Sequence, residues 1–206
     1  MAVEQARKVQ RRDRILDAAL SVFARKGYRE AAVDDVGLEA ETSKGGIYFH
    51  FPNKQAIFLA LLDRTSTLLL QRVEAAIASQ SDPIAKTEAA LHTVLQLFGS
   101  HRALARLFLV EALGAGREFH ERLAALRASF AGTIQQQLEE AIRGGSIPPI
   151  DAAVAGTVWF GALNEVVTRW VLEDAPCPLE DLYPALRVLL LRSIGAPDDS
   201  LLGTQR

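Results

Sequence analysis

The sequence has little of what marks secreted, membrane or disulfide-bonded proteins. Its 206 residues include one cysteine, Cys177, which lies between two prolines and cannot form a disulfide within the chain. No apolar run approaches the roughly 20 residues that a membrane helix needs. The N-terminus is charged and lacks the apolar centre of a signal peptide. These features predict a protein of the reducing cytoplasm.

The sequence also lacks the motifs on which common enzymes depend. It contains no GxSxG, no GxxxxGK[ST] and no HExxH. It has no Glu-x-x-His pair of the kind that a di-iron helical bundle uses. The histidines show no metal-ligand spacing; they are His50, His92, His101 and His120. We therefore expect neither catalysis nor a metal or other cofactor.

Charge is divided unevenly along the chain, although the net charge is only −2. Residues 1–54 hold 10 Lys and Arg and 8 Asp and Glu, a difference of +2, whereas residues 55–206 hold 13 and 17, a difference of −4. A frayed arm at residues 1–10 leads into a basic cluster that can follow a phosphate backbone. An ordinary solvated N-terminus is the alternative. The cluster comprises Arg7, Lys8, Arg11, Arg12 and Arg14.

The segment from Val33 to Lys54 has the pattern of two short helices joined by a tight turn. Val33, Val36 and Ala40 repeat at helical spacing. Ser43 provides an N-cap hydroxyl for a second helix, which Pro52 ends near His50. In that helix Ile47 and Phe51 share one face and can pack against the first helix. Two such helices form a helix-turn-helix.

The free face of the second helix carries small, aromatic and basic groups. Gly45, Gly46 and Phe49 point outward, with Tyr48 and His50 beside them. Two exposed helical glycines cost about 1 kcal/mol each relative to alanine, but a bare backbone can approach a groove wall closely. Lys44 can reach a phosphate or a guanine edge, and Tyr48, His50 and Lys54 can donate to phosphates. The alternative is a plain helical hairpin in a bundle.

This segment resembles the tetracycline-repressor (TetR) family of bacterial transcription regulators. The chain reads SKGGIYFHFPNK over residues 43–54, where the family pattern is S-K-G-x-[LI]-Y-x-[HY]-F-x-[ST]-K. Residues 15–19 and 23–28 match the family's first helix. The resemblance implies base contacts by Gly45, Gly46, Phe49 and Lys44. It implies contacts to the DNA backbone by Thr42, Ser43, Lys44, Tyr48, His50 and Lys54.

Three positions depart from the family pattern. Ala31 and Ala32 stand where a Thr usually caps the first motif helix, and Gly37 stands where Ala is common. Glu41 occupies a turn position that is usually Gly, and its charge is repelled by DNA. These departures bear on DNA affinity and operator sequence more than on the fold.

The periodicity predicts an all-α protein with about nine helices, no strand and no internal repeat. We expect a helix-turn-helix DNA-binding domain over 1–54, a ligand-sensing and dimerisation domain over 55–195, and a loose tail over 196–206. The expected helices span residues 12–26, 33–40, 43–50, 53–79, 83–98, 102–113, 118–143, 151–173 and 179–194.

The last two helices are more apolar than a surface helix of a small domain, with Gly156 and Gly161 permitting close approach. A twofold partner would bury them in a four-helix interface, as the family resemblance also implies. A wholly intramolecular core is the alternative. Two reading helices on a twofold axis would then read a palindrome with half-sites about 34 Å apart or a multiple of that spacing. Expected interface residues are Val158, Ala162, Val166, Leu182, Leu186 and Leu189.

A ligand site is expected between the long fourth helix and the C-terminal helices. Its candidate residues combine aromatic side chains with polar groups on apolar stripes. The plainer interpretation is ordinary core, with an ion pair between Glu111 and Arg127. The candidates are Phe98, Phe108, Glu111, Arg127, Phe130, Trp159 and Asn164.

Taken together, these features predict a ligand-responsive repressor that binds a palindromic operator as a homodimer. A small apolar or amphipathic effector would release it from DNA. The alternative is a dimeric helical protein that binds a small molecule and has weakened or lost operator binding.

Overall fold

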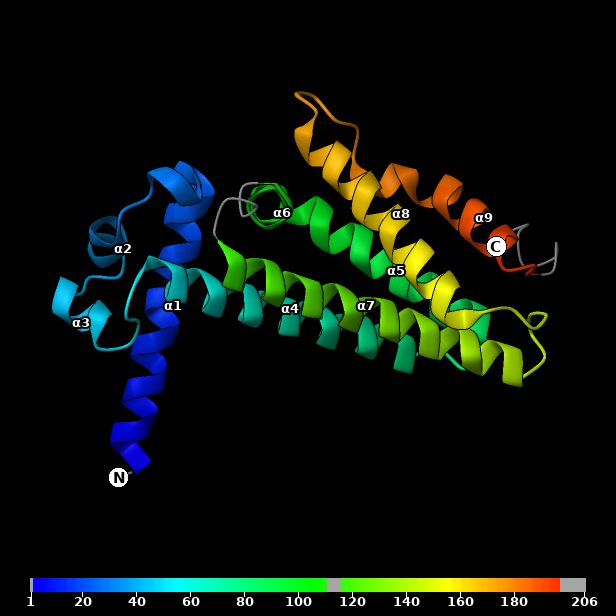
Figure 1. Ribbon diagram of the computed structural model, residues 1–206, viewed down its shortest axis with the longest axis horizontal. Helices are drawn as coiled ribbons and strands as arrows, with labels where there is room; N and C mark the ends of the chain where they lie inside the picture. Colours follow the sequence, from blue (N-terminus) through cyan, green and yellow to red (C-terminus); the bar gives the residue numbers. More distant parts are fainter. Residues whose placement is uncertain (1, 111–115, 197–206) are drawn as a thin grey trace. The chain divides into compact units, whose positions relative to one another are not determined.

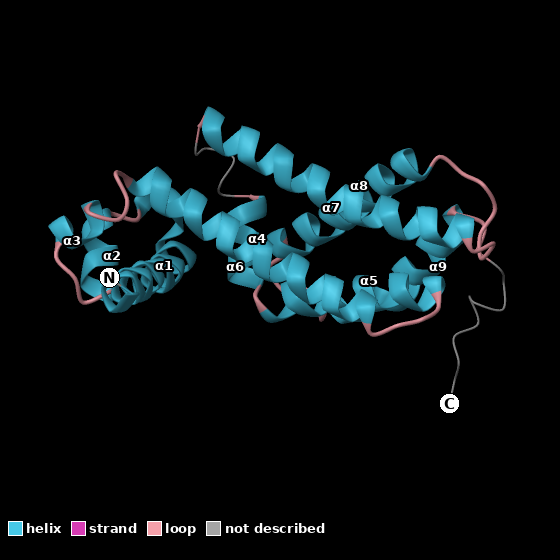
Figure 2. Ribbon diagram, turned by 90° about the horizontal axis from the view of Figure 1, so that it is seen from below, coloured by secondary structure: helices cyan, strands magenta, loops and turns pink. Residues whose placement is uncertain are grey.

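The structure, a computed structural model, describes residues 2–110 and 116–196 (Figure 1). Within these residues all regular structure is helical, and Figure 2 shows only helices and connecting loops. The predicted all-α class is confirmed. The chain forms two compact units, which are described separately. The first comprises Met1–Thr67 and Ala103–Arg122, and the second comprises Leu68–Arg102 and Leu123–Arg206.

The first unit contains the predicted helix-turn-helix. Its elements are α1 (Ala2–Glu30), α2 (Val33–Glu39), α3 (Lys44–Tyr48), the first part of α4 (Lys54–Ala78), most of α6 (Arg102–Leu109) and the start of α7 (Arg117–Arg143). The second unit contains the remainder of α4 and α7, α5 (Pro83–Ser100), α8 (Ala152–Leu172), a 3₁₀ turn (Leu179–Leu182) and α9 (Tyr183–Ser193).

The expectation of a frayed arm at residues 1–10 is wrong for the described part, because α1 begins at Ala2. Residues 2–12 are mostly Ala, Glu, Gln, Arg and Lys, all strong helix formers. The helix ends where expected, since Gly27 adopts φ 77° and ψ 160°. A short helical segment continues from there to Glu30.

An aromatic cluster forms the core of the first unit. The ring of Phe58, on α4, has its centroid 5.6 Å from Phe23 and 4.6 Å from Tyr28. The same ring lies 5.5 Å from Phe108 and 5.4 Å from Phe119. Because α4 brings these rings together, this unit extends beyond the division expected at residue 54.

Two exposed ion pairs lie around this core. Arg64 of α4 is 2.6 Å from Asp17 of α1, and Arg122 of α7 is 2.5 Å from Asp63 of α4. The carboxylate of Asp63 raises the pKa of Arg122 by accepting its hydrogen bond. Both pairs join α4 to its neighbours within the first unit.

The second unit depends on a close contact between α7 and α8. Gly156 is buried in α8, and a Cβ atom there would lie 2.8 Å from the carbonyl oxygen of Ala131. Trp159 Nε1 donates to Ser193 Oγ at 2.9 Å and so joins α8 to the end of α9. Trp170 Nε1 donates at 2.7 Å to the carbonyl oxygen of Cys177, whose side chain is exposed.

The C-terminal helix differs in detail from the expected single span. A 3₁₀ turn at Leu179–Leu182 precedes α9, and Pro184 lies in the first turn of α9, where no N–H is required. Ala196 is buried, and its N–H donates to the carbonyl oxygen of Leu191 at 3.1 Å, so the expected loose tail does not begin there. The rest of that tail lies outside the described residues. No described helix is both long and apolar enough to cross a membrane.

The contact at Gly156 predicts a specific loss of stability. Gly156→Ala should destabilise the chain by about 1–3 kcal/mol, because its methyl group would push α7 and α8 apart. Gly132→Ala, on α7, is the matched control, since a Cβ atom at Gly132 meets nothing within 4 Å. Urea unfolding at one fixed protein concentration compares them. Equal stability of the two variants would contradict the role given to Gly156.

Candidate nucleic-acid interface

The inward face of the helix-turn-helix is formed by the residues that the spacing predicted. Val36 and Ile47 are fully buried, Ala40 is 5% exposed, and Phe51 is 3% exposed. Their burial holds α3 against α2 and leaves the opposite side of α3 at the surface. The predicted orientation of α3 is confirmed.

The turn between the two helices explains two departures from the family pattern. Glu41 adopts the left-handed conformation, with φ 51°, and the Thr42 N–H donates to the Gly37 carbonyl at 2.9 Å. This is the helix ending that glycine usually provides. A Cβ atom at Gly37 would lie 3.1 Å from the Thr42 carbonyl oxygen, so Gly37 permits the close turn.

The third departure leaves α2 without a hydroxyl cap, but Asp35 supplies the other hydrogen bond of a capping box. Ala32 has no capping side chain, but its N–H donates to Asp35 Oδ2 at 3.0 Å. Lys26 Nζ lies 2.8 Å from Asp35 Oδ1 and, with the Ala32 N–H, lowers the pKa of that carboxyl. The sequence signal was an acid three residues after the cap, as in a capping box. We did not use it.

The exposed side of α3 carries Tyr48, Phe49 and Gly45. Phe49 is 70% exposed and Tyr48 is 43% exposed. Ser43 acts as the predicted N-cap, since its Oγ accepts from the Gly46 N–H at 3.1 Å. The nearest atom to a Cβ built on Gly45 is Ser43 Oγ, at 3.9 Å, so the space beyond Gly45 is open.

Gly46 does not lie on this open side, which corrects the role expected for it. A Cβ atom at Gly46 would lie 2.5 Å from Thr42 Oγ1. A side chain at Gly46 would have to displace the Thr42 hydroxyl, so Gly46 permits the close packing within the motif. Thr42 itself is half-buried beside it.

Lys54 also differs from its expected role as a phosphate contact. Its ammonium donates to the carbonyl oxygens of Tyr28, Arg29 and Ala31 at 2.9, 3.0 and 2.9 Å. An ammonium group has three donors, and all three are used here. Lys54 caps the end of the first helix and positions the motif instead of reaching DNA.

Lys44 forms an ion pair with Asp34, which was not among the predicted site residues. Lys44 Nζ lies 2.9 Å from Asp34 Oδ1 and 3.0 Å from Asp34 Oδ2. The hydrogen bond to Asp34 raises the pKa of Lys44. Both side chains remain about 60% exposed, so the pair is presented to any partner of α3.

The basic cluster of α1 lies beside the end of the motif. Lys8 Nζ is 5.3 Å from the Phe49 ring centroid, and Arg12 Cζ is 5.2 Å from that of Phe51. Partial burial lowers the pKa of His50, and the charges of Lys8, Arg11 and Arg12 lower it further. The helical start of α1 thus adds positive charge next to Phe49 and His50.

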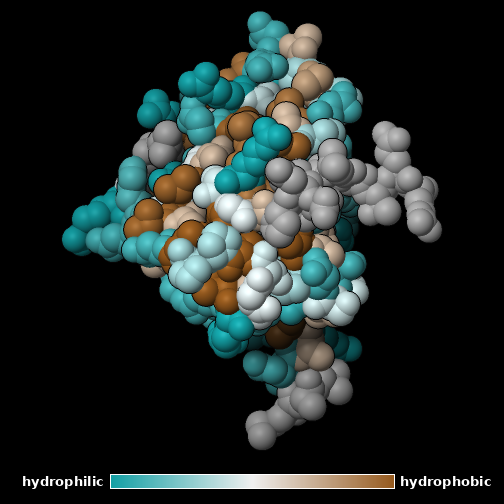
Figure 3. Space-filling model, turned by 90° about the vertical axis from the view of Figure 1, so that its right-hand side faces the viewer, coloured by the Kyte–Doolittle hydropathy of each residue, from teal (hydrophilic) through white to brown (hydrophobic). Residues whose placement is uncertain are grey.

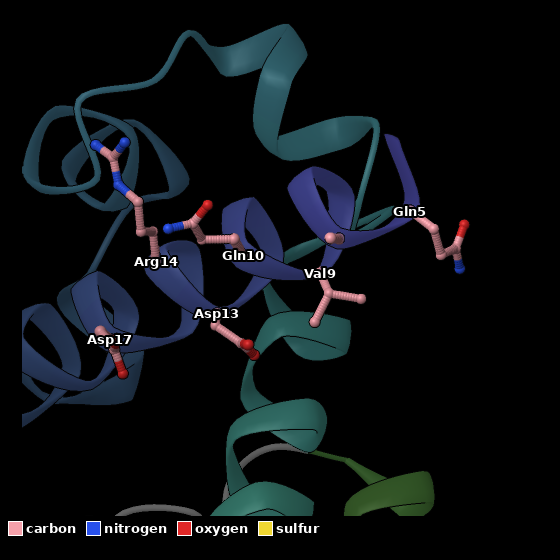
Figure 4. A pocket seen from close by; sticks show the side chains of 7 residues that line it. Gln5, Val9, Gln10, Asp13, Arg14 and Asp17 are labelled. Atoms are coloured by element: carbon pink, nitrogen blue, oxygen red, sulfur yellow. The ribbon is translucent and has the colours of Figure 1, made fainter. Parts of the chain in front are cut away.

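Another side of α1 forms an open groove, shown in Figure 4. Its lining includes the carboxylates of Asp13 and Asp17 together with Val9, which is 52% exposed. Arg14, at its edge, donates to the Ala40 carbonyl oxygen at 3.0 Å. Because two carboxylates repel phosphate, this groove is less suited to DNA than the side that carries Lys8 and Arg12.

The residues expected to bind a ligand are divided between the two units. Phe108 packs against Phe58 in the core of the first unit, and Trp159 is 3% exposed with its N–H bonded to Ser193. Arg127 is exposed, which corrects its expected burial. Glu111 lies outside the described residues.

The other three ligand candidates lie in the second unit and are half-buried: Phe98, Phe130 and Asn164. Phe130 is stacked on Phe160, with ring centroids 6.3 Å apart. These three residues remain candidates.

Most residues expected at a dimer interface remain at the surface of the second unit. Val158 is 57% and Leu189 67% exposed, whereas Ala162, Val166 and Leu182 are half-buried. Leu186 is 8% exposed and belongs to the core of its own subunit, which corrects its assignment. Val154 on α8, 58% exposed, was missed; it lies one helical turn before Val158.

Among the described residues, no group of three or more His, Cys, Asp or Glu side chains is arranged to hold a metal ion.

Two family models match the chain. Residues 15–61 match "Bacterial regulatory proteins, tetR family", and residues 80–194 match "Tetracyclin repressor-like, C-terminal domain". The first match contains α2 and α3. The second covers more than half of the sequence.

Individual relatives share most of the length of this chain. The fatty acid metabolism regulator protein of Bacillus subtilis (strain 168) is 26% identical over 87% of this chain and 93% of its own. The HTH-type transcriptional regulator EthR of Mycolicibacterium smegmatis is 31% identical over 78% of this chain and 74% of its own. The crystal structure of FadR from Bacillus subtilis in complex with stearoyl-CoA has a TM-score of 0.81 at 26% identity, covering 88% and 98% of the two chains.

The left-handed residue in the turn predicts a stabilising substitution. Glu41→Gly should raise the free energy of unfolding by about 1 kcal/mol, because glycine adopts this conformation without a Cβ penalty. The lost Arg14–Glu41 pair is exposed, with a 3.4 Å separation, and contributes little. Urea unfolding measures the change. Glu41→Ala removes the same ion pair but keeps the Cβ atom, so an equal gain in both variants would contradict this account.

Proposed function

This chain belongs to the tetR family of bacterial regulatory proteins, and we propose that it represses transcription as a homodimer bound to a palindromic operator. Binding of a small amphipathic effector would lower its affinity for that DNA. A regulator of this kind acts on chromosomal DNA in the cytoplasm and requires no catalytic centre.

The surface of α3 is the observation that carries this proposal. Phe49 projects from the helix beside the open backbone at Gly45, while buried Ile47 and Phe51 support it from behind. A major groove accepts a helix presented in this way. Lys8 and Arg12 supply positive charge beside the same surface. A purely structural hairpin has no need for this combination.

The departures from the family pattern do not favour the alternative of lost operator binding. Asp35 accepts from the Ala32 N–H although the capping Thr is missing, and Glu41 completes the turn in the required conformation. The motif therefore keeps its geometry, and Ser43 still caps α3.

Dimerisation is supported by apolar surface on the second unit. Val154 and Val158 of α8 and Leu189 of α9 are each more than half exposed. Figure 3 views the end of the molecule that includes α9, and brown apolar groups are interspersed there with teal hydrophilic residues. A twofold axis through α8 and α9 would cover such groups and pair two α3 helices with one palindrome.

The effector class is suggested by the relatives. The name of the Bacillus subtilis relative refers to fatty acid metabolism, and the solved FadR structure from that organism contains stearoyl-CoA. We propose that this chain responds to a long-chain acyl-CoA thioester. Such a molecule combines an apolar chain with a charged head, which matches the amphipathic effector expected from the sequence.

Operator binding has a direct test. Affinity for random duplex DNA and for the upstream region of the gene should both fall steeply with salt, by about 0.9 in log affinity per log salt for each phosphate neutralised. The upstream DNA should be bound at least about a thousandfold more tightly. Titration of labelled duplexes at several salt concentrations measures both quantities. Equal affinity for all duplexes would contradict a repressor function.

Gly45→Ala tests whether the operator is bound by this surface of α3. The added methyl group meets open space in the free protein, so stability should be retained or raised by up to about 1 kcal/mol. Operator affinity should fall by at least about tenfold, or roughly 1.4 kcal/mol, because the methyl group would lie against the groove. Gly132→Ala is the control on α7 and should leave affinity unchanged.

The effector proposal predicts two linked effects of stearoyl-CoA. At a free concentration of 100 Kd it should stabilise the folded protein by about 2.7 kcal/mol, which thermal unfolding detects. It should also weaken binding to the upstream duplex, because an effector shifts an equilibrium only by its difference in affinity. Coenzyme A alone and stearate alone are the controls. Stabilisation without any loss of DNA affinity would contradict effector-controlled release.

A further inference from the structure

We propose that Asp34 and Lys44 act as one unit that reads a G·C base pair in each half-site, an inference that rests on the proposed operator binding. Lys44 donates to the guanine edge while Asp34 accepts from the cytosine amino group. Asp34 is thereby assigned as a specificity-determining residue, although an acid at a DNA-facing surface would ordinarily weaken binding.

The ion pair places a hydrogen-bond donor, Lys44, beside an acceptor, Asp34. Lys44 Nζ lies 2.9 Å from Asp34 Oδ1 and 3.0 Å from Oδ2, so the carboxylate holds the ammonium from one side. An ammonium has three donors, and at least one remains for another acceptor. The carboxylate also keeps free acceptor positions, since it has about four in all.

Both side chains are placed where α3 meets its partner. Lys44 is the first residue of α3 and is followed by Gly45, beyond which the space is open. Asp34 reaches the same place from the first turn of α2. Their side chains are 60% and 64% exposed, so no other part of the first unit covers the pair.

The pair has little to contribute to folding. Exposed ion pairs of this kind contribute little to stability. The neighbouring acid, Asp35, already accepts from the Ala32 N–H at the start of α2. Asp34 is therefore dispensable for the motif, and its contact with Lys44 is better explained by what the pair presents outward.

The major-groove edge of G·C complements this arrangement. Guanine O6 and cytosine N4 are hydrogen-bonded to each other, so they are about 2.9 Å apart, similar to the separation of Lys44 Nζ and Asp34 Oδ1. Guanine N7 lies beside O6, so the remaining donor of the ammonium has two acceptors within reach. A·T also offers a donor, adenine N6, beside an acceptor, thymine O4, but that acceptor is flanked by the thymine methyl group and has no second acceptor next to it. The pair therefore favours G·C.

The test selects bound sequences from a random double-stranded DNA library and compares the wild-type protein with Asp34→Ala. The wild-type protein should prefer G·C at one position in each half-site by about 5- to 150-fold. In Asp34→Ala this preference should fall to about twofold or less, with preferences at other positions kept. Lys44→Gln should lose the preference at the same position.

Glu41→Ala is the matched control, because it also removes one carboxylate from the motif but does not touch Lys44. Both variants should bind random duplex DNA more tightly through reduced repulsion, and only Asp34→Ala should change a base preference. An unchanged G·C preference in Asp34→Ala, or an equal loss at every position, would overturn the inference. A wild-type protein without any sequence preference would instead refute the proposed function itself.

Discussion

The packing of one buried phenylalanine, Phe58, holds the first unit together. Its ring contacts aromatic rings from α1, α6 and α7, and each such pair contributes about 0.5–1.5 kcal/mol beyond its burial. Since α1 also packs against α2, which packs against α3, this core and the helix-turn-helix share one supporting helix. A shift of α6 or α7 cannot be absorbed locally, because close-packed interiors transmit strain. That rigidity is what an effector-controlled repressor requires.

The motif reaches the family's geometry by means of unusual residues. A carboxylate, Asp35, accepts from the Ala32 N–H where α2 lacks a hydroxyl cap, and Glu41 adopts a left-handed conformation that glycine adopts more readily. Lys54 satisfies three carbonyl groups near the end of the first helix. Each of these residues meets a requirement of the backbone, either a hydrogen-bond partner or a left-handed conformation.

Local patterns predicted the helices and the inward face of the motif because these depend on periodicity and on capping residues such as Ser43. The sequence could not reveal that Lys54 and Lys44 already have partners, since Tyr28 and Asp34 lie 26 and 10 residues away. Apolar composition likewise did not distinguish Leu186, buried within its own subunit, from exposed Leu189. Burial on a helix that is apolar on most sides depends on tertiary neighbours.

The distribution of charge on the first unit follows from these contacts. Within the described residues, four acids of α2 and the turn are paired with bases: Asp34 with Lys44, Asp35 with Lys26, Glu39 with Arg25 and Glu41 with Arg14. Three of these four acids are thus neutralised by bases of α1 and the fourth by Lys44. Lys8 and Arg12 lie against aromatic rings instead of carboxylates, so they keep their full charge. Long-range attraction to phosphate therefore comes mainly from the start of α1, and the paired groups of α2 and α3 are left to distinguish one base pair from another.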